Sequence, residues 1–145
     1  MDKVIDQRAK EHLIDFSIAT NPKYDPNWHH EEIANVVEDI ESGKFIQQGY
    51  QILMLFVPPR HGKSEECTIN LPAWYLGRNP DKEVITASYS AELALDFGGK
   101  TRSIVDTETY QRIFDLQLKK DEKGKAKWKT NKGGSYTSVG IGGPI

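Results

Sequence analysis

The chain has 145 residues, of which 37% are hydrophobic, so its length predicts one domain with a core of its own. A formal net charge of −2 gives no overall attraction to nucleic acid, so charged partners have to be argued from local features. A single cysteine, Cys67, excludes an internal disulfide framework; with no apolar run long enough to cross a membrane and no secretion signal, we expect a soluble, cytoplasmic protein.

Two amphipathic helices are expected ahead of the first strand. Apolar side chains recur at helical spacing in residues 3 to 19, and Asn21-Pro22 ends this pattern. Asp25-Pro26 then offers an N-cap and a first-turn proline for a second helix. His29 and His30 stand at its start. Because no cysteine or histidine partners lie at ligand spacing, we expect solvent-facing imidazoles rather than a metal site.

The central feature is an apolar run followed by a tight loop and a helix. Tyr50 to Val57 shows no period-two alternation, which is typical of a strand buried on both faces of a parallel sheet. The loop after it ends in Gly62-Lys63-Ser64, and a helical pattern follows. This order is that of a phosphate-binding loop, in which the first helical turn directs unpaired N–H groups and a positive dipole end at an anion.

Each residue of the Gly-Lys-Ser sequence has a chemical role in such a loop. Gly62 lets the backbone approach phosphate oxygens, Lys63 supplies charge for the β- and γ-phosphates, and the Ser64 hydroxyl ligates Mg²⁺. Val57 stands where the usual pattern begins with a glycine, so only half of the motif is present. The alternative is an ordinary strand-to-helix turn with Lys63 solvated. The helix dipole disfavours a cation there, which favours the anion site.

Strands and helices alternate after the loop. A helix kinked at Pro72 is followed by a short strand from Glu83 to Tyr89, and then by a helix from its N-cap Ser90 to about Val105. This order predicts right-handed crossovers and a mostly parallel sheet with helices on both faces. The expected fold class is therefore α/β, in three layers.

Beyond Thr107 the pattern weakens to one short helix around Ile113 and a lysine-rich stretch, Leu118 to Lys132. Clustered lysines displace counterions from nucleic acid, so contact with a phosphate backbone is one interpretation. A solvated loop between strands is the interpretation we favour. Trp128 is expected to be buried under the sheet, and residues 133 to 145 alternate small and apolar residues like a glycine-rich hairpin strand.

Several stretches together carry a resemblance to a known family. They are Pro58–Ser64, Ala87–Ser90, Leu93–Gly98, Trp128–Thr130, Gly133–Tyr136 and Gly140–Ile145. Over residues 26 to 145, behind an N-terminal helix and linker at 1 to 25, the chain is similar to the ATPase domain of the large terminase subunit of tailed bacteriophages. That motor pumps DNA into empty capsids. Its phosphate loop commonly has Pro-Pro-Arg ahead of Gly-Lys-Ser, which accounts for Val57 at the position where the usual motif has a glycine.

The resemblance implies a P-loop NTPase-like fold that binds ATP and Mg²⁺. It implies catalytic roles for Lys63, on the phosphates, and for Arg60, directed at the γ-phosphate; a loop-stabilising or exposed arginine is the alternative. His61 would pack on the loop or touch a phosphate. Ser64 would ligate the metal. The residues expected to hold the nucleotide are Pro59, Arg60, His61, Gly62, Lys63, Ser64 and Glu65.

The family's next strand ends in an Asp-Glu pair that positions the Mg²⁺ water and activates the attacking water. In the family this Walker B strand follows the Gly-Gly-Pro-Ile segment, whereas this sequence stops at Ile145. A nuclease domain that cuts concatemeric DNA would lie further on. We therefore expect a partial ATPase domain, truncated before the Walker B strand, that binds ATP with weak or absent hydrolysis.

The resemblance also implies partners: double-stranded DNA, the portal protein, the small terminase subunit and a ring of copies, in a bacterial host's cytoplasm. Arg102 is a candidate interface residue, although helix-face arginines are usually just solvated. Two other functions stay open: a non-catalytic nucleotide-binding remnant or interaction module, and another P-loop enzyme such as a helicase or a small kinase. A truncated parallel sheet leaves an unpaired edge, so we expect association or marginal stability.

Overall fold

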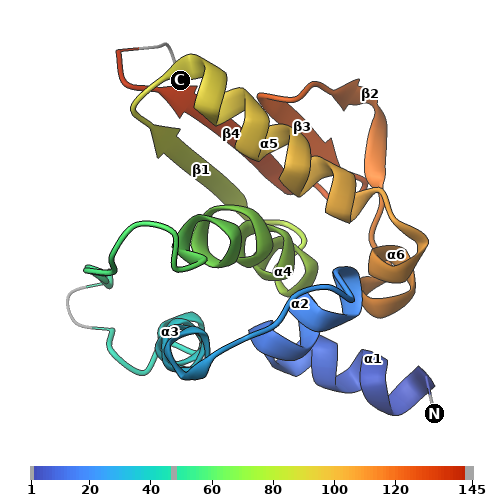
Figure 1. Cartoon of the computed structure of the whole chain (residues 1–145). Coiled ribbons are helices and arrows are strands. Elements are labelled where there is room, and N and C mark those ends of the chain that lie inside the picture. The colour runs from blue at the N-terminus through green and yellow to red at the C-terminus, as the bar shows by residue number, and fades with distance from the viewer. Residues whose placement is uncertain (1, 47–48, 143–145) are drawn as a thin grey trace.

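The computed structural model of the chain describes residues 2–46 and 49–142, and its N-terminal part is helical (Figure 1). Helix α1 spans Asp2–Glu11 and α2 spans Leu13–Thr20, so the single helix predicted there is divided in two. The division falls at His12, whose backbone is extended (φ −124°, ψ 126°). The amide of Leu13 donates to the carboxylate of Glu38 (2.9 Å), which ties the break to helix α3.

Helix α3 spans Trp28–Glu41 and is capped by Asn27, not by the predicted Asp25. The Asn27 side chain accepts a hydrogen bond from the Trp28 amide (2.8 Å), and Nδ1 of His30 accepts one from the Asn27 amide (2.9 Å). The prediction was wrong because Asn27 makes both halves of a reciprocal capping box, and a proline start was the weaker signal.

The helix after the loop begins as a π-helix. This segment, η1, spans Glu65–Asn70 and runs directly into α4, Leu71–Arg78. Pro72 lies in the first turn of α4 and has no N–H for the carbonyl of Thr68, whereas the amide of Leu71 donates to the carbonyl of Glu66, five residues back. Where the sequence predicted a kink at Pro72, the structure has a change from π-helical to α-helical hydrogen bonding.

Over the residues that the structure describes, the sheet has four strands in the order β1-β4-β3-β2. The remaining elements are β1 (Glu83–Ser88), α5 (Ala91–Val105), α6 (Glu108–Phe114), β2 (Leu118–Lys123), β3 (Lys127–Thr130) and β4 (Ser135–Gly140). Strands β1 and β4 are parallel, while the β2–β3 and β3–β4 pairs are antiparallel. The α/β class is confirmed, but the sheet is mixed rather than mostly parallel.

Two differences explain the mixed sheet. The lysine-rich stretch forms the β2–β3 hairpin, where a solvated loop was favoured. The predicted strand from Tyr50 to Val57 does not join the sheet: Tyr50 forms a single bridge, and residues 51 to 57 have no regular secondary structure. Several of its apolar side chains are exposed, with Ile52 at 72%, Met54 at 73% and Phe56 at 91%, whereas Leu55 and Val57 are partly buried against the core.

The core lies between the helices and one face of the sheet. Trp128 is fully buried, as predicted, and stacks on Tyr136 with ring centroids 4.9 Å apart. Helix α5 crosses this face closely, since a Cβ at Gly98 would lie 2.7 Å from Oγ of Ser138 on β4 and 2.3 Å from the carbonyl oxygen of Lys125 in the β2–β3 turn. On the other face Ile85 is 58% exposed, so the expected second helical layer does not cover it. No helix within residues 2–46 and 49–142 is long and apolar enough to span a membrane.

Candidate phosphate-binding loop

The loop ahead of η1 has an unusual backbone. Arg60 (φ 63°) and Gly62 (φ 74°) both lie in the left-handed region. For a residue with a Cβ such as Arg60, this conformation costs about 1 kcal/mol. Left-handed residues next to helical ones turn successive N–H groups toward one side, and such turns form anion-binding concavities. The loop therefore has the backbone character expected of a phosphate-binding loop.

Gly62 is required for two independent reasons. Its positive φ suits glycine, and a Cβ at this position would lie 2.3 Å from Nε2 of His30. His30 is buried at 8% exposure, with its ring 4.0 Å from that of His29 between centroids. The expectation that both imidazoles face solvent was therefore wrong for His30, because Gly62 admits its ring beneath the loop.

The protonation of His30 follows from this position. Burial and the neighbouring His29 ring lower the pKa of His30. Since Nδ1 accepts the amide hydrogen of Asn27, a neutral ring carries its proton on Nε2, the atom nearest Gly62. His30 thus acts as a neutral packing and capping residue.

Lys63 and Ser64 begin the helix, as the sequence predicted. The amide of Glu66 donates to the carbonyl of Gly62 (3.0 Å), which closes the first turn. Both the Lys63 and Ser64 side chains are exposed. The first N–H groups of a helix have no acceptor within it, so the amides of this turn are candidate donors to an anion.

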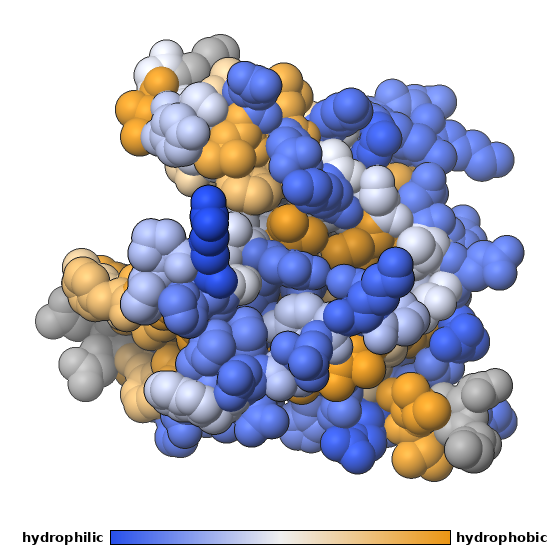
Figure 2. All heavy atoms as spheres, in the orientation of Figure 1, coloured by the Kyte–Doolittle hydropathy of each residue, from blue (hydrophilic) through white to orange (hydrophobic). Residues whose placement is uncertain are grey.

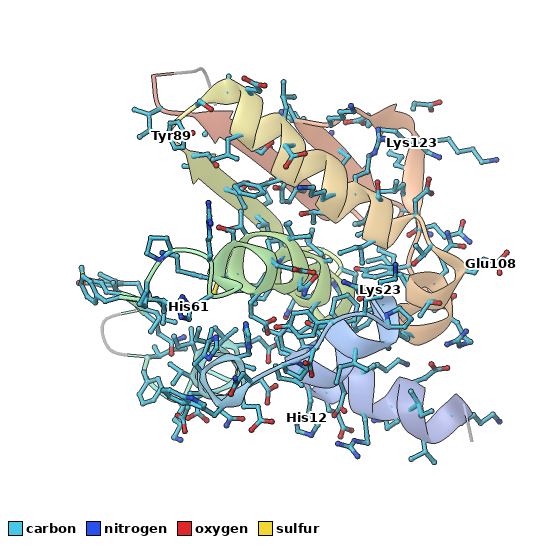
Figure 3. All side chains as sticks on the ribbon, viewed as in Figure 1. His12, Lys23, His61, Tyr89, Glu108 and Lys123 are labelled. Atoms are coloured by element: carbon cyan, nitrogen blue, oxygen red, sulfur yellow. The ribbon has the colours of Figure 1, made fainter. Side chains whose placement is uncertain are left out.

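The linker between α2 and α3 and the first turn of α3 hydrogen bond to the loop and to η1. Nε2 of His29, on α3, donates to the carbonyl of His61 (3.1 Å), and the side-chain amide of Asn21 donates to the carboxylate of Glu65 (3.2 Å). The Tyr24 hydroxyl donates to the carboxylate of Glu66. Figure 3 shows His61 on the side of the loop that faces α3. The loop conformation thus depends on residues far earlier in the sequence.

A cavity of about 350 Å³ lies between this linker and the loop. Four of the residues predicted to hold a nucleotide line it: Arg60, His61, Gly62 and Glu65. The linker and the first turn of α3 complete the wall with Asn21, Lys23, Tyr24, Asp25, Asn27, His29 and His30. Pro59, Lys63 and Ser64 do not line it. The structure therefore divides the predicted site: four of its residues line the cavity, while Pro59, Lys63 and Ser64 lie outside it.

Glu66 is an ionisable residue that sequence reasoning left without a role. It is fully buried, and burial raises its pKa to about 7, against the lowering effect of the Tyr24 hydrogen bond. Its second oxygen, Oε1, has no hydrogen-bond partner in the part of the chain that the structure describes. The available signal was helical spacing, because Glu66, Ile69 and Asn70 share a buried face.

Metal ligands are few around the loop. Within residues 2–46 and 49–142, no group of three or more His, Cys, Asp or Glu side chains is placed to hold a metal ion. The Ser64 hydroxyl in the first turn is the oxygen that the Gly-Lys-Ser pattern assigns to Mg²⁺, and its exposure leaves it accessible to a metal carried by a nucleotide.

The fold and the loop define an α/β protein with a mixed sheet, in which Gly62-Lys63-Ser64 starts a helix after a left-handed turn. No protein-family model, curated protein or solved structure significantly matches the chain. Its function has to be argued from these residues and this geometry.

Proposed function

We propose that the chain is the N-terminal, ATP-binding part of a phage terminase large subunit, the motor that packages double-stranded viral DNA by ATP hydrolysis. The observation that supports this most is the left-handed backbone of Arg60 and Gly62 directly ahead of a helix that starts with exposed Lys63 and Ser64. An ordinary loop-to-helix turn has no need of a strained arginine followed by a first-turn lysine.

The residues divide the chemistry among them. The Lys63 ammonium neutralises β- and γ-phosphate charge, the first-turn amides hydrogen bond to phosphate oxygens, and the Ser64 hydroxyl ligates Mg²⁺. Arg60 is the candidate for charge on the γ-phosphate. When bound, Mg²⁺ supplies charge neutralisation across the phosphates.

Hydrolysis by this chain is proposed to be weak or absent. The two carboxylates next to the loop are already engaged: Glu65 accepts from Asn21, and Glu66 is buried against Tyr24. We expect binding without turnover.

We further propose that the fold is a partial P-loop NTPase-like fold. Strands β1 and β4 supply a parallel pair, and the apolar residues 51 to 57 have the composition of a strand buried on both faces. In a complete ATPase domain this segment would be the strand that delivers the loop. Its exposed Phe56 side chain is explained by the absence of a neighbouring strand.

Calorimetric titration of Mg-ATP tests the proposal. Wild type should release heat with a saturable isotherm, and Lys63→Ala should bind at least tenfold more weakly because one phosphate-facing charge is lost. Lys82→Ala is the matched control, an exposed lysine beside Asp81 (3.6 Å) on the loop before β1. Equal binding by wild type and Lys63→Ala, or binding by neither, overturns the proposal.

A non-catalytic remnant is the second candidate. It is favoured by the position of residues 51 to 57 outside the sheet and by the absence of Lys63 from the cavity lining. Phosphate release separates the two: turnover well above that of Lys63→Ala would exclude the remnant and also contradict the weak hydrolysis proposed above. Failure of wild type to bind Mg-ATP would favour the remnant.

A further inference from the structure

Positive charge is concentrated in the β2–β3 hairpin and the turn that follows it. Leu118–Lys132 holds seven lysines against Asp121 and Glu122, a net charge of +5, in a chain whose formal charge is −2. The remaining residues therefore carry −7. In a protein of negative net charge, this concentration of positive charge creates a local surface that attracts anions.

Only part of this charge is neutralised within the protein. Glu122 accepts from both Lys119 (3.0 Å) and Lys129 (2.8 Å), and Lys132 lies 3.8 Å from Asp115. Across the described ranges, four other lysines of the hairpin form no ion pair: Lys120, Lys123, Lys125 and Lys127. Their charge is available to a partner.

The fold adds an arginine to the same place. The Arg102 guanidinium on α5 donates to the carbonyl of Lys123, a neutral partner that leaves its charge uncompensated. The Lys125 side chain lies along α5 beside Gly99, and Arg102 and Lys125 line one cavity of about 590 Å³. Glu65 and Asp96 also line this cavity, and Asp96 pairs with Lys100 (2.7 Å), so the cavity itself is of mixed charge. We call Arg102, Lys120, Lys123, Lys125 and Lys127 the basic tip. Figure 2 shows hydrophilic side chains covering this end of the molecule, and Figure 3 labels Lys123 there.

We propose that the basic tip binds the phosphate backbone of double-stranded DNA without sequence preference. The identity of the partner rests on the proposed packaging function, while the contact itself is electrostatic and independent of ATP. Lysines on a strand and its turn present mobile cations to successive phosphates, and each contact releases condensed counterions.

The chemistry of the hairpin favours duplex over single-stranded nucleic acid. Single strands are held by bases stacked on exposed aromatic rings. The aromatic residue of the hairpin is Trp128, which is fully buried against Tyr136 and cannot stack on a base. The hairpin presents positive charge, and positive side chains contact the phosphate backbone rather than the bases.

Protection of a sheet edge is a competing explanation for part of the pattern. Strand β2 is an edge strand, and edge lysines deter pairing with other chains. That accounts for Lys120 and Lys123. It does not account for Lys125 in the turn, Lys127 on β3, or Arg102 on α5.

Fluorescence anisotropy with a labelled duplex of about 30 base pairs tests the proposal. The tip variant is K120Q/K123Q/K125Q/K127Q, and the matched control is K3Q/K10Q/K44Q/K82Q, which has the same net charge. At 50 mM salt we expect the tip variant to bind about tenfold more weakly or worse, and the slope of log K against log salt to become shallower by up to about 3.6, or 0.9 per phosphate contact. The control should stay within about twofold of wild type.

Three further measurements keep the outcome decisive. Circular dichroism and melting show whether the tip variant is folded, and K120R/K123R/K125R/K127R, which keeps the charge, should bind like wild type. If the tip and control variants lose DNA affinity equally, binding depends on net charge alone. If the tip variant aggregates while its DNA affinity is unchanged, the lysines protect the sheet edge. Either result overturns the proposal. Tighter binding of a single strand than of the duplex would also overturn it.

The two proposals can fail separately. The tip variant should bind Mg-ATP like wild type, and Lys63→Ala should bind DNA like wild type. Loss of DNA binding by the tip variant with no ATP binding by any variant would sustain the basic tip and overturn the nucleotide site.

Discussion

The hydroxyl of Tyr24 donates a hydrogen bond to the carboxylate of Glu66, 42 positions away in the sequence. Tyr24 comes from the linker before α3, and Glu66 lies in η1, directly behind the Gly-Lys-Ser turn. This bond joins the N-terminal helices to the helix that carries the candidate phosphate-binding loop. It also places an acid with a pKa of about 7 in the interior, so stability and pH are linked through it.

Glu66→Gln should stabilise the protein above neutral pH. Because the folded-state pKa of Glu66, about 7, exceeds its ordinary value of 4.5, the folded state holds a proton that the unfolded state has released. The contribution of protonated Glu66 to the free energy of unfolding is fully present below pH 4.5 and is lost as the pH rises to about 7. We expect Gln, which cannot ionise, to raise the free energy of unfolding by about 3 kcal/mol at pH 8 and to change it little at pH 4.

Urea unfolding at a series of pH values measures this difference. Glu65→Gln is the control, because Glu65 is the adjacent acid but is exposed. A Glu66→Gln curve parallel to that of wild type from pH 4 to pH 8 would show that Glu66 ionises normally.

Tyr24→Phe should destabilise the protein, and more strongly at pH 8 than at pH 5. Above pH 7 the loss of the hydroxyl leaves a buried carboxylate without its donor, at a cost of about 1 to 3 kcal/mol. Below pH 7 the Glu66 carboxyl is neutral, so removing the Tyr24 hydroxyl costs less stability. Thermal melting at the two pH values checks this, with Tyr89→Phe as the control because its ring is 77% exposed. Equal loss at both pH values would contradict the linkage to Glu66.

Gly62→Ala should cost more than a positive φ alone explains. Gly133→Ala is the reference, since Gly133 has φ 96° but no atom within 4 Å of a built Cβ. At Gly62 the added methyl also meets His30 at 2.3 Å, so we expect a further loss of about 1 to 3 kcal/mol. In the double variant Gly62→Ala/His30→Ala that further loss should largely disappear. If the losses in free energy of unfolding for Gly62→Ala and His30→Ala simply add in the double variant, the contact does not contribute and the prediction is wrong.

The free edge of β1 should promote association. The sheet ends at β1, where Ile85 is 58% exposed, and unpaired apolar strands pair with other chains. Sedimentation velocity should show wild type self-associating with concentration and Ile85→Lys more monomeric. Val4→Lys, also at an exposed apolar side chain (67%) but on α1, should leave association unchanged. A wild type that stays monomeric at all concentrations would contradict this prediction.

Elements with complete local signals were predictable. Strand β1 and helix α5 lie where the sequence placed them, because Ser90 caps the helix by accepting from the Leu93 amide (3.2 Å), a signal contained within four residues. The left-handed turn at Gly62 likewise follows from glycine next to a helix start. The signals for these features lie in neighbouring residues, although the loop around Gly62 is also held by earlier residues.

Elements that depend on distant partners were not predictable. Residues 51 to 57 have strand composition, yet a strand also needs a neighbour to hydrogen bond with, and composition cannot supply one. Lysines are poor strand formers, but Trp128 stacking on Tyr136 holds β3 in the sheet and its lysines with it. The burial of His30 depends on Gly62, which is visible only once the loop folds over α3.

The wide π turn of η1 has a consequence for where the Gly-Lys-Ser side chains point. Each helical residue is rotated relative to the next, so changing the pitch behind Ser64 changes the angular position of Lys63 around the helix axis relative to the buried face of α4. Pro72 lies just past this turn, in the first turn of α4. The pitch of η1 thus enters the angle between the candidate phosphate-binding lysine and the protein core.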